Sequence, residues 1–268
     1  MKKQDETTDS ADSVQKVGAV AASVGRGLAI AGRYVGTKVA AAYNGIDPDV
    51  RRHIAQLPLM SYSLLARGEK PVVARESDGF PPLVFVHGLG GGRGDFAPMA
   101  LYLRNKGRRR SYSIRFEGGG DVEARGGQLA RFILQVLEAN GESQVDVVAH
   151  SLGGVIAWTA LVDHSMGPKV RRLVTMGSPH GGTYAARLGN TPVTWDLRPN
   201  SPFLQRLRKS PFPSTVKATS FWSASDLVIL PAESAALPNS QQIEMTPFTH
   251  YGYLIHPRSW HAVHLAIS

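Results

Sequence analysis

The chain has 268 residues, of which 43% are hydrophobic, and it contains no cysteine. Disulfide bonds are therefore excluded, and a chain of this length and composition can bury the core of a single α/β domain. The formal net charge of +9 favours anionic partners. No recognised nucleic-acid-binding motif accompanies that charge, so no nucleic acid partner is expected.

Residues 1–70 are predicted to form a helical extension that is separate from the rest of the chain. Between residues 14 and 43, apolar residues fall on one helical face and basic residues fall on the opposite face. The apolar positions are Val17, Val24, Leu28, Val35, Val39 and Tyr43, and the basic ones are Lys16, Arg26, Arg33 and Lys38. Such a helix can lie on an anionic membrane surface, or it can pack on the rest of the protein or pair through small residues such as Gly32 and Gly36. Both interpretations stay open from the sequence.

The expected location of the protein depends on the same extension. The arginines within it argue against a membrane-spanning helix, which needs about 20 apolar residues. The first six residues, MKKQDE, turn acidic where a signal peptide needs an apolar core. We therefore expect an intracellular protein that is cytoplasmic or bound peripherally to a membrane.

From residue 71 to residue 268, short apolar runs alternate with helix-like segments. Strands are predicted at 83–86, 112–116, 145–149, 170–176, 216–222 and 242–245, with helices near 96–105, 128–139 and 155–161. This alternation predicts an α/β domain with a mostly parallel sheet that is covered by helices on both faces. Residues 183–215, which are rich in proline and arginine and include a short helix at 203–208, are predicted to be a lid-like insertion over the active-site edge.

A glycine-rich loop, HGLGGG at 87–92, follows the first predicted strand. Backbone N–H groups in such a loop can turn inward and stabilise the oxygen that becomes negative in a tetrahedral intermediate. The predicted donors of this oxyanion hole are the N–H groups of Leu89 and Leu152. A phosphate-binding loop is the rival interpretation. It is disfavoured because the run lacks a G-x-G-x-x-G frame that begins a helix and lacks a Gly-Lys-Ser/Thr sequence.

Residues 145–154 read VDVVAHSLGG, and an apolar helix-like stretch follows at once. A strand, a serine between small residues and a helix form the layout of a nucleophile elbow. Ala149 and Gly153 supply the small residues that this tight turn needs, and Gly154 lets the helix pack close to the strand. We therefore predict that Ser151 is a nucleophile. The alternative is that its side chain merely caps the helix.

In folds with such an elbow, an acid and then a histidine follow the serine along the chain. Asp226 comes shortly after the strand predicted at 216–222, and His250 lies in the loop after the strand predicted at 242–245. Both side chains would then lie at the carboxyl edge of the sheet, beside Ser151. His250 would take the proton of Ser151 as a general base, and Asp226 would fix the tautomer of the imidazole.

Other histidines and acids compete for these two roles. Asp196 is the main competing acid, since it also lies between Ser151 and His250, but it falls within the insertion. His256 is the main competing base. The remaining candidates are predicted to be structural: His261 and His264 on a final helix, His150 in a structural hydrogen bond, His87 and His180 in loops bordering the cleft, and Asp146 and Asp163 as solvated or capping carboxylates.

Together, these motifs resemble those of a known family. His87-Gly88, AHSLGG at 149–154 and GSPHGGT at 177–183 look like the α/β-hydrolase lipases and esterases of bacteria. Residues 197–204 are similar to a segment of lipases related to the lecithin–cholesterol acyltransferase and inositol-deacylase groups. The resemblance runs from about residue 80 to about residue 265. It implies an α/β-hydrolase fold and a bacterial-type serine lipase or esterase, and it agrees with the acid and base proposed above.

We accordingly expect a carboxylic ester hydrolase of lipase type that acts on a lipid or another acyl ester through Ser151, Asp226 and His250. No cofactor and no metal ion are expected. An acyltransferase or a phospholipase with the same triad stays an alternative, because pocket walls decide the acceptor and one sequence does not show them. A catalytically silent scaffold of the same fold is the alternative from another class.

Overall fold

The computed structural model describes residues 45–56 and 71–268. The helix predicted between residues 14 and 43 lies outside these residues, so its contact with membranes stays a prediction. The chain divides into two compact units, residues 1–51 and 52–268. Helix α2 (Pro48–Gln56) crosses the boundary between them, and all other described elements belong to the second unit.

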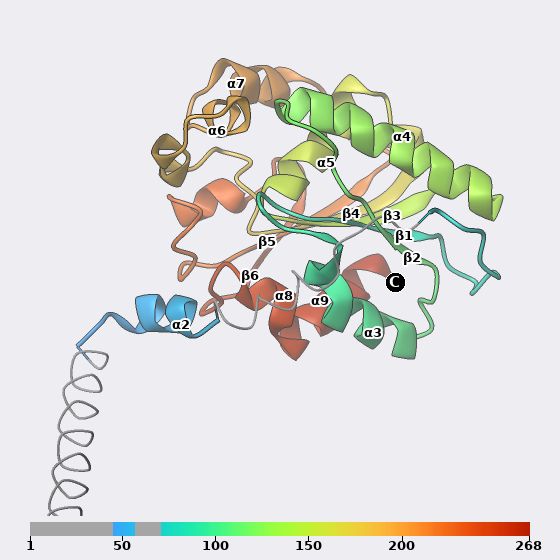
Figure 1. Cartoon of the computed structure of the whole chain (residues 1–268), viewed down its shortest axis with the longest axis horizontal. Coiled ribbons are helices and arrows are strands. Elements are labelled where there is room, and N and C mark those ends of the chain that lie inside the picture. Colours follow the sequence, from blue (N-terminus) through green and yellow to red (C-terminus); the bar gives the residue numbers. More distant parts are fainter. Residues whose placement is uncertain (1–44, 57–70) are drawn as a thin grey trace, which may run out of the picture. The chain divides into compact units, whose positions relative to one another are not determined.

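Within the described residues, six strands form one sheet in the spatial order β2-β1-β3-β4-β5-β6 (Figure 1). The strands are β1 (Leu83–Val86), β2 (Ser111–Ser113), β3 (Val145–His150), β4 (Val170–Met176), β5 (Lys217–Trp222) and β6 (Gln241–Glu244). Every neighbouring pair is parallel, which confirms the expected type of sheet. Strands β1 and β3 are buried at every position, which explains why they read as continuous apolar runs.

Helices cover both faces of this sheet, as expected (Figure 1). Helices α4 (Val122–Asn140) and α5 (Leu152–Asp163) pack on one face, and α3 (Ala97–Asn105), α8 (Gly252–Ile255) and α9 (Pro257–Ile267) pack on the other. Neighbouring residues of one strand therefore belong to different cores: Val84 joins the core under α4 and α5, whereas Phe85 joins the core under α3 and α9. Among the described residues, no helix is long and apolar enough to cross a membrane.

The predicted elements are present, with shifted ends. Helix α4 begins at Val122, earlier than the helix predicted near 128, because the Asp121 carboxylate accepts the N–H of Ala124 and caps the first turn. It ends at Gly141, whose φ of 62° is a conformation that glycine adopts readily. Strand β2 is shorter than predicted and stops at Ser113.

The insertion contains three short helical segments. They are η4 (Tyr184–Leu188), α6 (Pro192–Asp196) and α7 (Pro202–Lys209). Only α7 corresponds to a helix predicted from the sequence. Three further 3₁₀ segments lie elsewhere in the described chain. Segment η2 (Arg93–Phe96) leads into α3, η3 (Gly167–Lys169) precedes β4, and η5 (Ala232–Ala235) follows β5.

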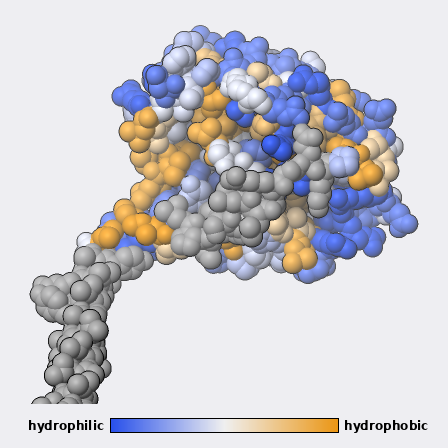
Figure 2. Space-filling model, in the orientation of Figure 1, coloured by the Kyte–Doolittle hydropathy of each residue, from blue (hydrophilic) through white to orange (hydrophobic). Residues whose placement is uncertain are grey.

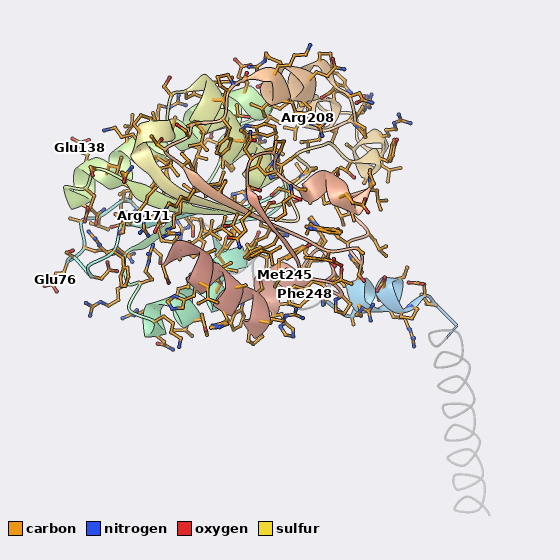
Figure 3. The ribbon with its side chains drawn as sticks, turned by 180° about the vertical axis from the view of Figure 1, so that it is seen from behind. Glu76, Glu138, Arg171, Arg208, Met245 and Phe248 are labelled. Carbon is orange, nitrogen blue, oxygen red and sulfur yellow. The ribbon has the colours of Figure 1, made fainter. Side chains whose placement is uncertain are left out.

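Asp146, expected to be a solvated or capping carboxylate, is fully buried. Its carboxylate pairs with Arg108 at 2.6 Å and with Arg171 at 2.7 Å, and both guanidinium groups also donate to the carbonyl of Ile267. Figure 3 places Arg171 at the opposite end of the sheet from Met245, which directly follows β6. The two arginines therefore connect Asp146, at the amino edge of the sheet, to the end of α9. Asp146 is not at the edge where an acid of a catalytic triad would lie.

Candidate active site

Ser151 occupies the sharp turn between β3 and α5. Its φ of 55° and ψ of −131° are uncommon for a residue with a side chain and store backbone strain. The glycines after it allow this turn, because a Cβ at Gly153 would lie 2.3 Å from the carbonyl oxygen of Val86, and one at Gly154 would lie 2.1 Å from the Ser178 hydroxyl. The small residues predicted for an elbow are thus required by close contacts, and Ser151 makes no capping hydrogen bond with its side chain.

The structure brings the three predicted residues together. The Ser151 hydroxyl lies 3.0 Å from Nε2 of His250, and Nδ1 of the same ring lies 2.9 Å from Oδ2 of Asp226. Asp226 follows β5 and His250 follows β6, so neighbouring parallel strands deliver both side chains to one edge of the sheet. Both are buried, with exposed fractions of 2% and 4%. This is the geometry of a nucleophile, a base and an orienting carboxylate.

The surroundings of Asp226 hold its carboxylate in the ionised form. Burial alone would raise its pKa, but the charge and the hydrogen bond of His250 outweigh burial, together with the N–H groups of Val228 and Ile229. These two N–H groups donate to Oδ1 at 2.9 and 3.1 Å. The net result is a lowered pKa for Asp226, so its second oxygen stays an acceptor for the Nδ1–H of His250.

The buried imidazole of His150 contacts the backbone of His250. Its Nε2 lies 2.8 Å from the carbonyl oxygen of His250, which confirms the predicted structural hydrogen bond. Burial lowers the pKa of His150 to about 3, and the adjacent His250 contributes to this shift. A neutral ring must then donate from Nε2, since a carbonyl can only accept. His150 therefore fixes the backbone of His250 and stays uncharged.

Comparison with known proteins identifies the fold. The sequence model of the alpha/beta hydrolase fold family matches residues 81–190, a span that includes the glycine-rich loop and the elbow. The chain has the alpha/beta hydrolase fold. The chain superimposes on a lipase of Bacillus licheniformis in its mature form with a TM-score of 0.59 and 19% identity, over 74% of this chain and 98% of that one.

Two further solved structures show the same fold. Lipase B of Aspergillus fumigatus has a TM-score of 0.61 and 19% identity, and the match covers 72% of this chain and 54% of that protein. A protein of Listeria innocua has a TM-score of 0.55 and 16% identity, with 70% of this chain and 94% of that chain covered. At these identities, the likeness establishes the common fold.

A cavity of about 780 Å³ opens beside Ser151. Ser151 and His250 line it, and so do Leu89 and Leu152. Leu152 is the first residue of α5, where an N–H has no acceptor within its own helix. A Cβ at Gly88 would lie 2.8 Å from the Cβ of Ser151, so the glycine-rich loop passes directly against the elbow. The role of the two leucine N–H groups as oxyanion donors stays a prediction.

The predicted insertion supplies one wall of the cavity. Its contributing residues are Thr183, Ala185, Ala186, Leu188, Gly189, Thr194 and Leu197. All of them belong to η4, α6 and the adjoining turns. In the described part of the chain, residues 198–215 contribute none of the lining. Only residues 183–197 of the predicted insertion, which spans residues 183–215, therefore contribute to the wall.

The competing side chains serve other contacts. Asp196 accepts the N–H of Val122 at 3.1 Å, and His256 caps α9 by accepting the N–H of Arg258. His180 is fully buried, with Nε2 3.1 Å from the Thr175 hydroxyl. His87 is nearly buried too, and among the described residues neither ring lines the cavity. The two loops border the cavity as expected, through Gly88 and Pro179, while both histidine side chains are buried.

The sequence analysis missed two side chains that hold the site in place. His53, near the end of α2, accepts the N–H of His250 at 3.2 Å and the N–H of Leu227 at 3.4 Å through Nε2. It thus holds the loop of His250 and the residue that follows Asp226. Asp95 lines the cavity, and its Oδ2 accepts the N–H of Gly92 at 3.1 Å in the glycine-rich loop. No sequence motif marks either residue. His53 binds backbone groups that are far away along the chain, and Asp95 binds a backbone group in a loop without regular secondary structure.

Proposed function

We propose that this alpha/beta hydrolase cleaves carboxylic esters of lipids or other acyl compounds through an acyl-enzyme on Ser151. The observation that carries the proposal is the unbroken series of hydrogen bonds from Asp226 through His250 to Ser151. This series ends at the mouth of a cavity with mainly apolar walls. A catalytically silent scaffold would not need these three side chains to be hydrogen-bonded in this order.

In the first half of the reaction, His250 takes the proton of Ser151 while the serine oxygen attacks the ester carbonyl. A serine hydroxyl is a weak nucleophile at neutral pH, so this proton transfer is required. Asp226 accepts the Nδ1–H, which keeps the lone pair of Nε2 directed at the hydroxyl, and stabilises the imidazolium as it forms. The N–H groups of Leu89 and Leu152 would donate to the oxygen of the tetrahedral intermediate.

In the second half, the same groups act in reverse. His250 returns its proton to the leaving alcohol, and the acyl group remains on Ser151 as an ester. Water then enters the site, gives a proton to His250 and attacks the acyl carbonyl. Collapse of this second intermediate releases the acid and restores the serine hydroxyl. Every proton in this cycle moves through Nε2 of His250.

The walls of the cavity favour an apolar acyl group. Apart from the residues of the glycine-rich loop and the triad, most of the lining is aliphatic, with Leu188, Leu197, Val228, Ile229 and Leu254 among it. Burying the methylene groups of an acyl chain against such side chains stabilises the complex by about 0.8 kcal/mol each. The cavity volume of about 780 Å³ is within the range of small-molecule sites.

The decisive experiment is the replacement Ser151→Ala. We expect loss of labelling by a fluorophosphonate probe and loss of hydrolysis of nitrophenyl esters by about 10⁴-fold or more, because the triad acts as a unit. The melting temperature should change little. A panel of nitrophenyl esters of increasing chain length, assayed with the unchanged chain, then measures acyl preference.

A matched pair of histidine variants controls this test. His250→Ala should be as damaging as Ser151→Ala, whereas His256→Ala, which loses only a helix cap, should retain most of the activity. Labelling of the Ser151→Ala protein, or a reversed order of the two histidine variants, would contradict the proposed mechanism.

A further inference from the structure

The insertion that lines the cavity has a second, outward face. In η4, Ala185, Ala186 and Leu188 line the cavity, whereas Arg187 lies in a separate surface pocket of about 590 Å³. In α6 and the turn after it, Thr194 and Leu197 face the cavity, and Trp195 and Arg198 line the same outer pocket as Arg187. The segment 184–198 is therefore a thin wall between the catalytic cavity and solvent.

Large apolar side chains are exposed on this wall and around the cavity mouth. Leu188 is 93% exposed and Leu89 is 60% exposed, although both line the cavity. Tyr184 and Trp195 are about half exposed, at 53% and 49%. The backbone N–H of Tyr184 donates to the carbonyl of Leu230, whose side chain is also exposed. Figure 2 shows hydrophobic residues gathered on the flank beside α6. Contiguous exposed apolar surface of this kind marks a site of interaction.

The same wall carries unbalanced positive charge. Within residues 45–56 and 71–268, neither Arg187 nor Arg198 forms an ion pair with a carboxylate. Arg187 stacks over the ring of Tyr184 at 5.1 Å, and one terminal nitrogen of Arg198 donates to the carbonyl of Gly189. Arg187 is exposed and Arg198 lines the outer pocket, so both can donate to an anionic group outside the protein.

We propose that the surface formed by Leu89, Tyr184, Arg187, Leu188, Trp195, Arg198 and Leu230, termed the rim, docks on an anionic lipid surface. Apolar side chains would enter the region between headgroups and acyl chains, and the two arginines would bind headgroup phosphates. Since Leu89 and Leu188 belong to both the rim and the cavity, docking directs the cavity mouth at the lipid. An acyl ester can then reach Ser151 without crossing water. The delivery of an acyl ester to Ser151 rests on the proposed function, whereas docking on lipid does not depend on it.

Vesicle sedimentation tests the proposal with the full chain carrying Ser151→Ala, so that no lipid is consumed. The vesicles are pure phosphatidylcholine or an equal mixture of phosphatidylcholine and phosphatidylglycerol. We expect Leu188→Ser to lower partitioning onto the mixed vesicles by about tenfold, because an exposed leucine loses its transfer from water. Arg187→Gln should lower it by about fivefold at low salt, and this difference should disappear at high salt.

Two substitutions on other exposed helices serve as matched controls. Leu265→Ser removes a leucine that is 61% exposed on α9, and Arg104→Gln removes an exposed arginine from α3. Both should bind mixed vesicles within twofold of the parent chain. Near-ultraviolet and far-ultraviolet circular dichroism of every variant report retention of the fold.

The proposal is overturned if the rim variants sediment like the parent chain, as they would if another segment of the chain supplied all lipid contact. It is also overturned if the controls weaken binding as much as the rim variants do, since binding would then follow net charge and hydrophobicity alone. Hydrolysis of a soluble nitrophenyl ester by the chain with Ser151 intact is measured separately. Failure of that assay would refute the proposed function and leave the vesicle result standing.

Discussion

Replacing Asp226 with asparagine tests which tautomer the base needs. Oδ1 of Asp226 accepts the N–H groups of Val228 and Ile229, and the amide oxygen of an asparagine can keep both bonds. The amide NH₂ then faces Nδ1 of His250, where Oδ2 lies 2.9 Å away in the native site. Nδ1 must accept from that NH₂, so the ring carries its proton on Nε2 and cannot take the proton of Ser151.

The expected loss in kcat is about 10⁴-fold, equivalent to about 5.5 kcal/mol of transition-state stabilisation. The assay is steady-state hydrolysis of a soluble nitrophenyl ester, accompanied by a thermal melt that should show little change. Asp196→Asn is the matched control, because this carboxylate contacts only the N–H of Val122 among the hydrogen bonds of the described chain, and its kcat should stay within about threefold. Equal losses for the two variants, or a loss below tenfold for Asp226→Asn, would refute the assignment of the acid.

The remaining predictions concern stability. Asp146→Asn leaves the buried guanidinium of Arg108 without its carboxylate and should lower the free energy of unfolding by about 3–5 kcal/mol. Asp163→Asn breaks a pair with the half-exposed Arg206 and should cost less than about 1 kcal/mol, and urea unfolding of both variants measures the contrast. The pKa values of His150 and His180, each lowered to about 3 chiefly by burial, predict acid sensitivity. Between pH 6.5 and 3 the unfolded chain binds protons that the folded chain does not, so each histidine should lower stability by about 1.4 kcal/mol for every unit that the pH falls below 6.5. Equal stability at pH 7 and pH 5 would contradict this reasoning.

The features of the candidate site that could be predicted from the sequence, and that the structure brings together, are those set by local rules. The elbow at Ser151 needs a strand, small neighbours and a helix, and all three are contiguous in the chain. Strands β5 and β6 end just before the loops of Asp226 and His250, and parallel strands bring their carboxyl ends to one edge. Chain order and strand ends were therefore sufficient to select these two residues from several acids and histidines.

The parts that the sequence could not predict depend on contacts between distant segments. The buried position of Asp146 results from Arg108, Arg171 and the carbonyl of Ile267, three partners from three different regions. A single acidic residue in a strand gives no sign of such partners. The two faces of the insertion were hidden for another reason. Segments η4 and α6 are only five residues long, too short for a hydrophobic period to indicate which side chains point inward.

His250 illustrates how a loop residue acquires the fixed geometry that catalysis needs. Its N–H donates to His53, its carbonyl accepts from His150, and its ring lies between Asp226 and Ser151. Misplacing a reacting group by about 1 Å can cost a hundredfold in rate, and a loop with only one of these contacts could turn about its backbone. With the backbone held on both sides of the residue, the side chain retains little freedom beyond its own torsions, and the bond to Asp226 restricts those. The strained turn holds Ser151, and these backbone contacts hold His250, so the 3.0 Å distance between the two side chains is set independently from both sides.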